Sequence, residues 1–281
     1  MYILSMRMRP ITIILLMCIS ACSFHSKQQT VENIALASTF AKRSILSSPF
    51  LLTSYEHVQR KGGAAQVYIE GDGQAWLSKR TASLDPTPNN PIALKLAALD
   101  GADNVFYLAR PCQYSKMIDE TLCEQEYWTS HRFAPEVIDA MNVALDDMKQ
   151  RHSISKFHLI GFSGGGNVAA LLAARRDDIA SLRTVAGNLN HALQSKLHAV
   201  SPMPESLNAK DIAHHISHIP QIHFVGALDE VVPQSITQSY KSAAGASPCV
   251  QSLLVPNVGH AEGWESQWPM LLKHAVDCTG K

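Results

Sequence analysis

The sequence predicts an α/β protein with a mostly parallel central sheet and helices on both of its faces. Two observations indicate this fold class: short β-branched or aromatic runs alternate with longer helical patterns, and no second domain boundary interrupts the alternation. The chain has 281 residues, of which 46% are hydrophobic and 17% charged. That length can bury one substantial core, and the composition excludes disordered and collagen-like chains.

The expected strands are short apolar runs that end in polar or glycine-rich turns. They lie at residues 50–55, 67–70, 105–109, 157–161, 182–186, 222–226 and 253–255. An amphipathic helix is expected after Pro135, an alanine- and leucine-rich helix at 167–175, and a C-terminal helix at 263–276. Residues 189–220 are long for a simple connection, so we expect them to form a small cap.

The first 21 residues have the features of an export signal. Arg7 and Arg9 precede an apolar run at 11–19, which is too short to span a bilayer comfortably because a span needs about 20 apolar residues. The run ends in Ile-Ser-Ala-Cys at 19–22, which resembles the lipobox of bacterial lipoproteins. That resemblance implies a diacylated Cys22 at the mature N-terminus. The alternative is ordinary secretion with cleavage after Ala21, and both readings export the protein.

The lipobox resemblance also implies a location and a domain layout. Ser23 stands where an aspartate would favour retention in the inner membrane, so we expect an outer-membrane lipoprotein of the cell envelope. Residues 22–32 are polar and are expected to form a tether. The folded domain is then expected to span residues 33–281. The lipid on Cys22 makes the membrane an expected partner.

The cysteines predict disulfides. Cys112, Cys123, Cys249 and Cys278 remain after removal of the signal and lipidation of Cys22. Exported proteins meet an oxidising compartment, and four cysteines allow three pairings. Local pairing of Cys112 with Cys123 and of Cys249 with Cys278 is favoured. No two of them have zinc-finger spacing, so no cysteine metal site is expected.

The charges and the histidines suggest neither a nucleic-acid partner nor a cofactor. The chain has 24 basic and 24 acidic residues, which gives no basic field for phosphates. His214, His215, His218 and His223 lie close in sequence, but no nearby carboxylate or cysteine completes a tetrahedral metal set. We therefore expect surface or helix-end histidines here. No cofactor is expected.

Residues 161–166, Gly-Phe-Ser-Gly-Gly-Gly, contain the pattern G-x-S-x-G between an expected strand and an expected helix. A serine there lies on a sharp, strained turn, and glycines are needed where a Cβ would collide with neighbouring backbone. Three consecutive glycines are otherwise costly in a helix, by roughly 1 kcal/mol each relative to alanine. The pattern makes Ser163 the candidate nucleophile.

A serine nucleophile in a fold of this class needs an acid and a histidine, in that order, after later strands. Asp229 lies in the loop after the strand at 222–226, with Glu230 as the second candidate. His260 lies between the last strand and the C-terminal helix. The strand ending at Ala186 leads into a segment without a carboxylate, which removes one competing position for the acid.

With these motifs, the chain resembles the α/β hydrolases from about Phe50 to Cys278. Gly-x-x-Asp-x-x-Val-Pro occurs at 226–233 and Gly-His at 259–260, as in that superfamily. A closer likeness is to exported bacterial hydrolases with Ile-Glu-Gly-Asp-Gly, here at 69–73, and Arg-Pro-Cys-Gln, here at 110–113. The resemblance implies an α/β-hydrolase fold with a catalytic triad of Ser163, Asp229 and His260.

An acyl-transfer site also needs an oxyanion hole made of backbone N–H groups. Gly164 is expected to supply one, and Asp72 or Gly73 the other, at a position where related lipases and esterases carry His-Gly-Gly. Glu70 and Asp72 put carboxylates close to this anion site, so their side chains must turn away or be paired. Arg110 and Arg132 are the candidate partners. An ordinary glycine turn at 71–73 is the alternative.

These residues predict a serine hydrolase that cleaves a carboxylic ester, of a small molecule or a lipid, through an acyl-enzyme. Two alternatives stay open: a peptidase or amidase with the same triad, and a tethered binding protein that kept the fold without turnover. Tyr127, Trp128, Trp264 and Trp268 either line the substrate cleft or pack in the core.

Overall fold

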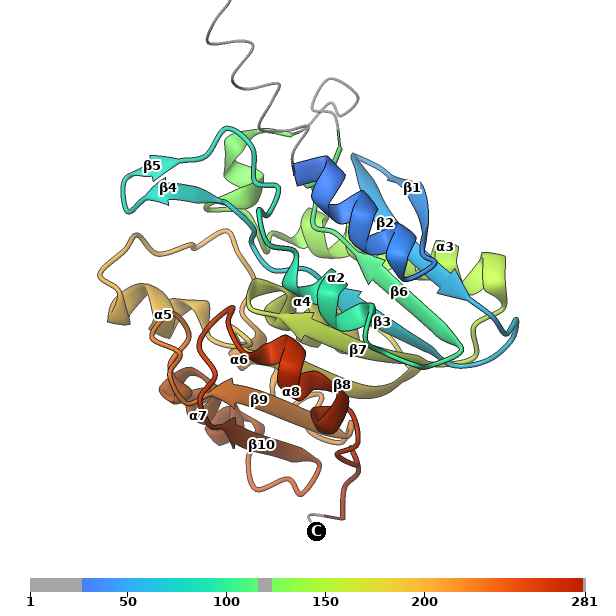
Figure 1. Ribbon diagram of the computed structural model, residues 1–281. Coiled ribbons are helices and arrows are strands. Elements are labelled where there is room, and N and C mark those ends of the chain that lie inside the picture. The colour runs from blue at the N-terminus through green and yellow to red at the C-terminus, as the bar shows by residue number, and fades with distance from the viewer. Residues whose placement is uncertain (1–26, 116–122, 280–281) are drawn as a thin grey trace, which may run out of the picture.

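The computed structural model describes residues 27–115 and 123–279 (Figure 1). Its centre is an eight-stranded sheet in the order β1-β2-β6-β3-β7-β8-β9-β10. All neighbours from β6 to β10 are parallel, while β2 pairs antiparallel with both β1 and β6. The strands are β1 (Ala41–Ser47), β2 (Phe50–Val58), β3 (Ala65–Ile69), β6 (Asn104–Leu108), β7 (Phe157–Phe162), β8 (Ile179–Val185), β9 (Gln221–Gly226) and β10 (Val250–Val255). The mostly parallel sheet expected from the sequence is confirmed.

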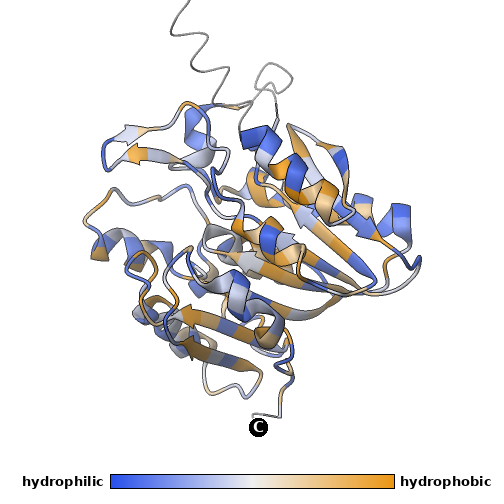
Figure 2. Cartoon of the chain, in the orientation of Figure 1, coloured by the Kyte–Doolittle hydropathy of each residue, from blue (hydrophilic) through white to orange (hydrophobic). Residues whose placement is uncertain are grey.

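Helices cover both faces of this sheet because its strands are apolar on both sides. Val67 and Ile69 pack into one core, and Tyr68 between them packs into the other, as the two-residue period of a strand requires. One core takes α3 (Pro135–His152), α4 (Gly164–Ala173) and α7 (Gln234–Ala244). The other takes α2 (Ile92–Ala97) and α8 (Trp264–Leu271). Figure 2 shows the hydrophobic strands between more hydrophilic outer helices.

A small hairpin lies outside the main sheet. It consists of β4 (Trp76–Ser78) and β5 (Thr81–Ala82), which pair antiparallel and stand at one end of the molecule (Figure 1). Its side chains are largely exposed, including 46% of Trp76 and 60% of Leu77. Neither this hairpin nor the edge strand β1 was expected from the sequence.

A helix occupies part of the segment that the sequence predicted as a tether. Residues 27–37 form a helix, so the expectation of a tether over 22–32 is wrong for 27–32, and the folded part begins before residue 33. Val31 and Ala35 lie one turn apart and are buried in the core on the face of the sheet covered by α2 and α8, which anchors the helix. Residues 1–26, with the expected signal and Cys22, lie outside the described residues.

Two further segments differ from or refine the expectations. The C-terminal helix ends at Leu271, not near residue 276, and the chain then turns back so that Cys278 reaches Cys249 beside β10. The expected cap over 189–220 contains only the short helices α5 (His191–Leu197) and α6 (Ala209–Ile212). Within the described ranges, no helix has both the length and the apolar character that crossing a bilayer would require.

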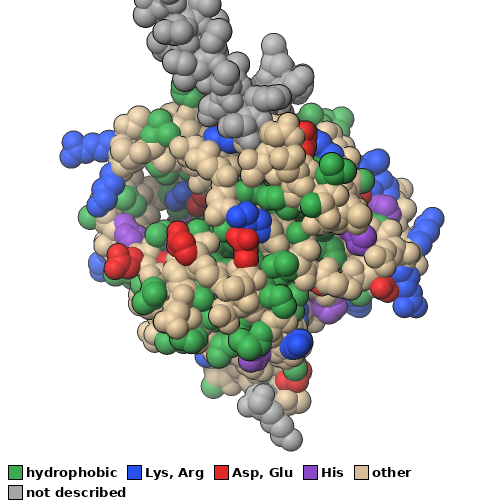
Figure 3. All heavy atoms as spheres, in the orientation of Figure 1, with side chains coloured by type: hydrophobic (Ala, Val, Ile, Leu, Met, Phe, Trp, Pro, Cys, Tyr) green, Lys and Arg blue, Asp and Glu red, His purple; other side chains and the backbone are tan. Residues whose placement is uncertain are grey.

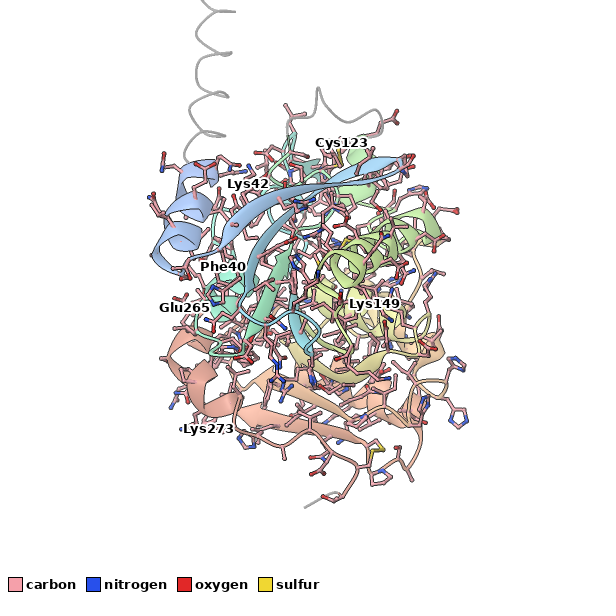
Figure 4. The ribbon with its side chains drawn as sticks, turned by 90° about the vertical axis from the view of Figure 1, so that its right-hand side faces the viewer. Phe40, Lys42, Cys123, Lys149, Glu265 and Lys273 are labelled. Atoms are coloured by element: carbon pink, nitrogen blue, oxygen red, sulfur yellow. A yellow bond between two sulfur atoms is a disulfide. The ribbon has the colours of Figure 1, made fainter. Side chains whose placement is uncertain are left out.

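Both expected disulfides are present. Cys112 is bonded to Cys123 and Cys249 to Cys278, with sequence separations of 11 and 29 residues. The two bridges lie at opposite ends of the molecule (Figure 4). The second one fastens the segment after α8 to the start of β10.

Removing the second bridge should destabilise the protein measurably. Closing a loop of this length restricts the unfolded chain, so Cys249→Ser/Cys278→Ser should lower the free energy of unfolding by about 3 kcal/mol. Urea denaturation of the double variant and the wild type measures the difference. Equal midpoints and equal slopes would contradict the prediction.

Candidate active site

Ser163, Asp229 and His260 come together at the carboxyl edge of the parallel strands. Ser163 follows β7, Asp229 follows β9 and His260 follows β10. The Nε2 atom of His260 is 3.0 Å from Ser163 Oγ, and its Nδ1 atom is 2.9 Å from Asp229 Oδ2. The three side chains therefore form one hydrogen-bonded chain from hydroxyl to carboxylate.

The turn at Ser163 is strained. Its φ of 50° and ψ of −119° lie in a region that non-glycine residues rarely adopt. The turn also brings α4 close to β3, where a Cβ on Gly165 would lie 2.3 Å from the carbonyl oxygen of Ile69. The glycines after Ser163 therefore let the helix start directly beneath the serine and leave its hydroxyl exposed to the site.

The carboxylate of Asp229 is fully buried and tightly held. Its Oδ1 atom accepts hydrogen bonds from the N–H groups of Val231 and Val232, at 2.9 and 2.8 Å, while Oδ2 faces His260. Glu230, the second candidate for the acid, is exposed to solvent. The loop therefore selects Asp229 because two backbone donors compensate its buried charge.

The imidazole of His260 is oriented by more than Asp229. Its ring lies 5.4 Å from that of Phe162, and the indole N–H of Trp264 donates to its backbone carbonyl at 2.9 Å. Trp128, Trp264 and Trp268 are buried, so the packing interpretation holds for these tryptophans. Only the position of Trp264 immediately after the Gly-His loop could have indicated its contact with His260.

The loop after β3 passes directly beside the serine. A Cβ on Gly71 would lie 3.3 Å from Ser163 Cβ, and the Gly71 N–H donates to Glu70 Oε1 at 2.9 Å. Gly73 has a φ of +63° and packs against Pro86. Within the ranges that the structure describes, the N–H groups of Asp72, Gly73 and Gly164 donate to no protein acceptor.

The carboxylate of Asp72 forms ion pairs with two arginines, which compensate its negative charge next to a site that must bind an anion. The carboxylate lies 3.3 Å from Arg110 Nη1 and 3.0 Å from Arg132 Nη1. Arg110 is buried and also donates to the carbonyl oxygen of Arg132. Burial lowers the pKa of Arg110 to about 10, and the Asp72 charge acts in the opposite direction. Two guanidinium groups thus face one carboxylate, so the cluster keeps a net positive charge.

Glu70 turns away from the site and into the core beneath the loop. It is 1% exposed, and its Oε1 atom also receives the Ala93 N–H at 3.5 Å. Burial raises the pKa of this carboxyl to about 7, and the N–H groups of Gly71 and Ala93 act in the opposite direction. Among the described residues, no donor forms a hydrogen bond with its Oε2 atom.

Glu70→Gln should make the protein more stable at high pH. The pKa of Glu70 is about 7 in the folded protein and near 4.5 in the unfolded chain. The free energy of unfolding of the wild type should therefore fall by on the order of 3 kcal/mol as the pH rises from 4.5 through 7. Glutamine has the same shape, keeps an acceptor for the Gly71 N–H and cannot ionise. Thermal denaturation at pH 5 and pH 8 should show the advantage of the variant growing with pH, and a constant difference would contradict it.

A pocket of about 750 Å³ opens onto the triad. Ser163, His260 and Phe162 lie on its wall, together with Arg132 and Asp72. Residues 194–203 border it, in agreement with the expected cap, and the hairpin contributes Trp76, Ser78 and Lys79. The contribution of the hairpin could not be foreseen, because nothing local in residues 74–79 points to a distant site.

The described residues contain no group of three His, Cys, Asp or Glu side chains placed to hold a metal ion. His214, His215 and His218 are exposed, as expected, whereas His223 is fully buried within β9, so the expected surface position is wrong for that residue.

Comparison with known proteins agrees with this fold. Residues 116–253, just under half of the chain, match the model of the family described as serine hydrolase (FSH1). An esterase of Pyrococcus furiosus, Pf2001, superposes with a TM-score of 0.58 at 13% identity, over 85% of this chain and 93% of that one. The chain therefore has the α/β-hydrolase fold, and the matched part resembles that serine hydrolase family.

Other solved structures of this fold have different reported activities. Est1E from Butyrivibrio proteoclasticus has a TM-score of 0.54 at 12% identity, over 83% of this chain and 96% of its own. The acylaminoacyl peptidase of Pyrococcus horikoshii has a TM-score of 0.58 at 9% identity, over 83% of this chain but 41% of its own. No curated protein matches the sequence. At these identities the likeness concerns the fold alone.

Proposed function

We propose that this protein is a serine hydrolase that cleaves carboxylic esters through an acyl-enzyme on Ser163. The observation that carries the proposal is the continuous pair of hydrogen bonds from Ser163 Oγ through His260 to the buried Asp229. A hydroxyl is a weak nucleophile unless a base accepts its proton, and a neutral imidazole at 3.0 Å is such a base. The intact triad weighs against a non-catalytic binding protein.

In the first half-reaction, Ser163 Oγ attacks the acyl carbon while its proton passes to His260 Nε2. The buried carboxylate of Asp229 holds Nδ1–H and stabilises the imidazolium that forms. The N–H groups of Gly164 and of Asp72 or Gly73 are our candidates for the oxyanion hole, because the Gly71 N–H already donates to Glu70. We take Asp72 first because its carboxylate lies directly beside Gly164. The imidazolium then protonates the leaving alcohol. In the second half-reaction His260 takes a proton from water as the water oxygen attacks the acyl carbon. The bond from that carbon to Ser163 Oγ then breaks, His260 returns the proton to Ser163 Oγ, and the acid leaves.

The net positive charge of Arg110, Arg132 and Asp72 supports this choice of oxyanion hole. A lone carboxylate beside Gly164 would oppose the negative charge that develops in the transition state. The two guanidinium groups more than neutralise it. We therefore assign the arginines the role of keeping Asp72 in place and its charge compensated.

Labelling and turnover assays test the proposal. A fluorophosphonate should modify Ser163, as peptide mass spectrometry would detect, and Ser163→Ala should not be labelled. Short and long acyl p-nitrophenyl esters should be hydrolysed faster than p-nitroanilide amides of the same acyl groups. Faster amide cleavage would assign the site to a peptidase or amidase, and absence of labelling in folded wild type would contradict the mechanism.

We also propose that the protein is exported and anchored in the bacterial outer membrane through a lipid on Cys22. The support is the short apolar run that ends in Ile-Ser-Ala-Cys at 19–22. Cys22→Ser should therefore release the protein from the membrane fraction. An unmodified N-terminus, at Cys22 or elsewhere, found by mass spectrometry of the mature protein would contradict lipidation.

A further inference from the structure

The rim of the active-site pocket carries exposed apolar side chains. Trp76, Val200 and Val231 line the pocket yet are 46%, 42% and 47% exposed. Leu77 follows Trp76 in β4, Leu84 lies two residues after β5, and Leu197 is the last residue of α5; they are 60%, 81% and 51% exposed. We call these six residues the pocket rim. Isolated exposed hydrophobic residues are normal, but a concentration of them around one opening is typical of an interaction surface.

Two segments of the pocket rim carry basic residues and no acid, whereas the exposed Glu230 adjoins Val231. Residues 74–84 contain Lys79 and Arg80 and no acid, and residues 191–203 contain Lys196 and no acid. Within the described part of the chain, these three exposed cations form no ion pair. Basic side chains project from the edge of the molecule where the hairpin lies (Figure 3). An apolar surface with unpaired cations and an exposed tryptophan suits a lipid bilayer with anionic headgroups.

The start of the folded chain lies next to this surface. Lys27 Nζ is 3.0 Å from Asp85 Oδ2, and Asp85 directly follows Leu84 of the pocket rim. Cys22 precedes Lys27 by five residues, which can span at most about 18 Å. A lipid on Cys22 would therefore keep Leu84 within a short distance of the bilayer.

We propose that the pocket rim docks on the lipid bilayer and that the pocket takes an acyl ester of a membrane lipid directly from it. Trp76 and Leu77 then enter the interfacial layer, and Lys79 and Arg80 meet anionic headgroups. An acyl chain would then enter the pocket, which Trp76 and Val200 both line, from the bilayer without crossing water. The inference rests on the proposed hydrolase activity for its substrate, but the docking itself requires no catalysis.

Fluorescence quenching tests the docking. Trp76 is exposed, whereas Trp128, Trp264 and Trp268 are at most 5% exposed, so a bilayer in contact with the pocket rim reaches Trp76 first. The exported full-length product carrying Ser163→Ala is placed in phosphatidylcholine and phosphatidylglycerol vesicles with brominated acyl chains. Its emission should be quenched, and the same chain with Trp76→Phe should lose that quenching. Equal quenching in the two chains overturns the proposal.

Turnover on two substrates tests the delivery of lipid. Leu77→Ser/Leu84→Ser removes exposed side chains that do not line the pocket. We expect this variant to hydrolyse a water-soluble short-chain ester as the wild type does, and a long-chain ester embedded in vesicles about tenfold more slowly. The matched control is Val143→Ser/Met270→Ser, which removes comparably exposed side chains from α3 and α8. It should leave both rates unchanged.

The outcomes separate this inference from the proposed function. A wild type that cleaves neither ester contradicts the hydrolase proposal, while the quenching result still decides the docking. Equal loss in the variant and its control, or no loss in either, overturns the role of the pocket rim. Sedimentation showing a dimer that shields Trp76 from a soluble quencher would assign the rim to a second copy and overturn it too.

Discussion

Ser163→Ala should lower kcat for an ester by about 10⁴- to 10⁶-fold, because no other group in the site can form the acyl-enzyme. The serine hydroxyl is the only side chain hydrogen-bonded to His260 Nε2 in the described structure. Its replacement removes one oxygen and creates no new contact, so the melting temperature should stay close to that of the wild type. Stopped-flow and steady-state assays with a p-nitrophenyl ester measure the loss.

The other two residues of the triad, His260 and Asp229, should act as a unit with Ser163. His260→Ala should cost about as much as Ser163→Ala, and Asp229→Asn roughly 10⁴-fold, since an amide would favour the wrong imidazole tautomer. The losses should not add in the double variant Ser163→Ala/His260→Ala. Glu230→Gln is the matched control, because Glu230 neighbours Asp229 but is exposed. Wild-type turnover in Asp229→Asn, with loss in Glu230→Gln, would show that the acid is wrongly assigned.

Gly164→Ala should lower kcat by about 10²- to 10³-fold, the loss expected when one oxyanion donor is displaced. A Cβ on this residue would lie 2.0 Å from Asp72 Oδ1. The carboxylate cannot simply move aside, because Arg110 and Arg132 hold it from the other side. The clash therefore shifts the Asp72 backbone, the Gly164 backbone or both, and these carry two of the candidate N–H groups.

The effect of Gly164→Ala should appear in kcat more than in KM, because the oxyanion forms only in the transition state. Alanine is intrinsically better than glycine in a helix, so a loss cannot be attributed to weaker helix formation in α4. Gly101→Ala is the control, since no atom lies within 4 Å of the Cβ it would add. Unchanged kcat in a folded Gly164→Ala protein would exclude Gly164 and Asp72 as the oxyanion pair.

The sequence by itself determined the fold class and the candidate triad because both depend on local patterns. Alternating strand and helix periods require a covered, mostly parallel sheet, and G-x-S-x-G between them fits the strained turn at Ser163. Chain order then limited the acid and base to the loops after later strands, where Asp229 and His260 occur. The favoured disulfide pairs also followed from short separations along the chain.

Only the tertiary structure decided the features that join distant segments. The structure favours Asp229 over Glu230 as the candidate acid, because the buried Oδ1 atom of Asp229 accepts hydrogen bonds from two N–H groups. Asp72 is 38 residues from Arg110 and 60 from Arg132, and only the fold of three loops brings these charges together. The β4–β5 hairpin likewise lines the pocket only because the fold brings it there. A periodic pattern in the sequence reflects the environment of one helix or strand. Contacts between distant segments depend on how several elements pack together, and no single stretch of sequence contains that information.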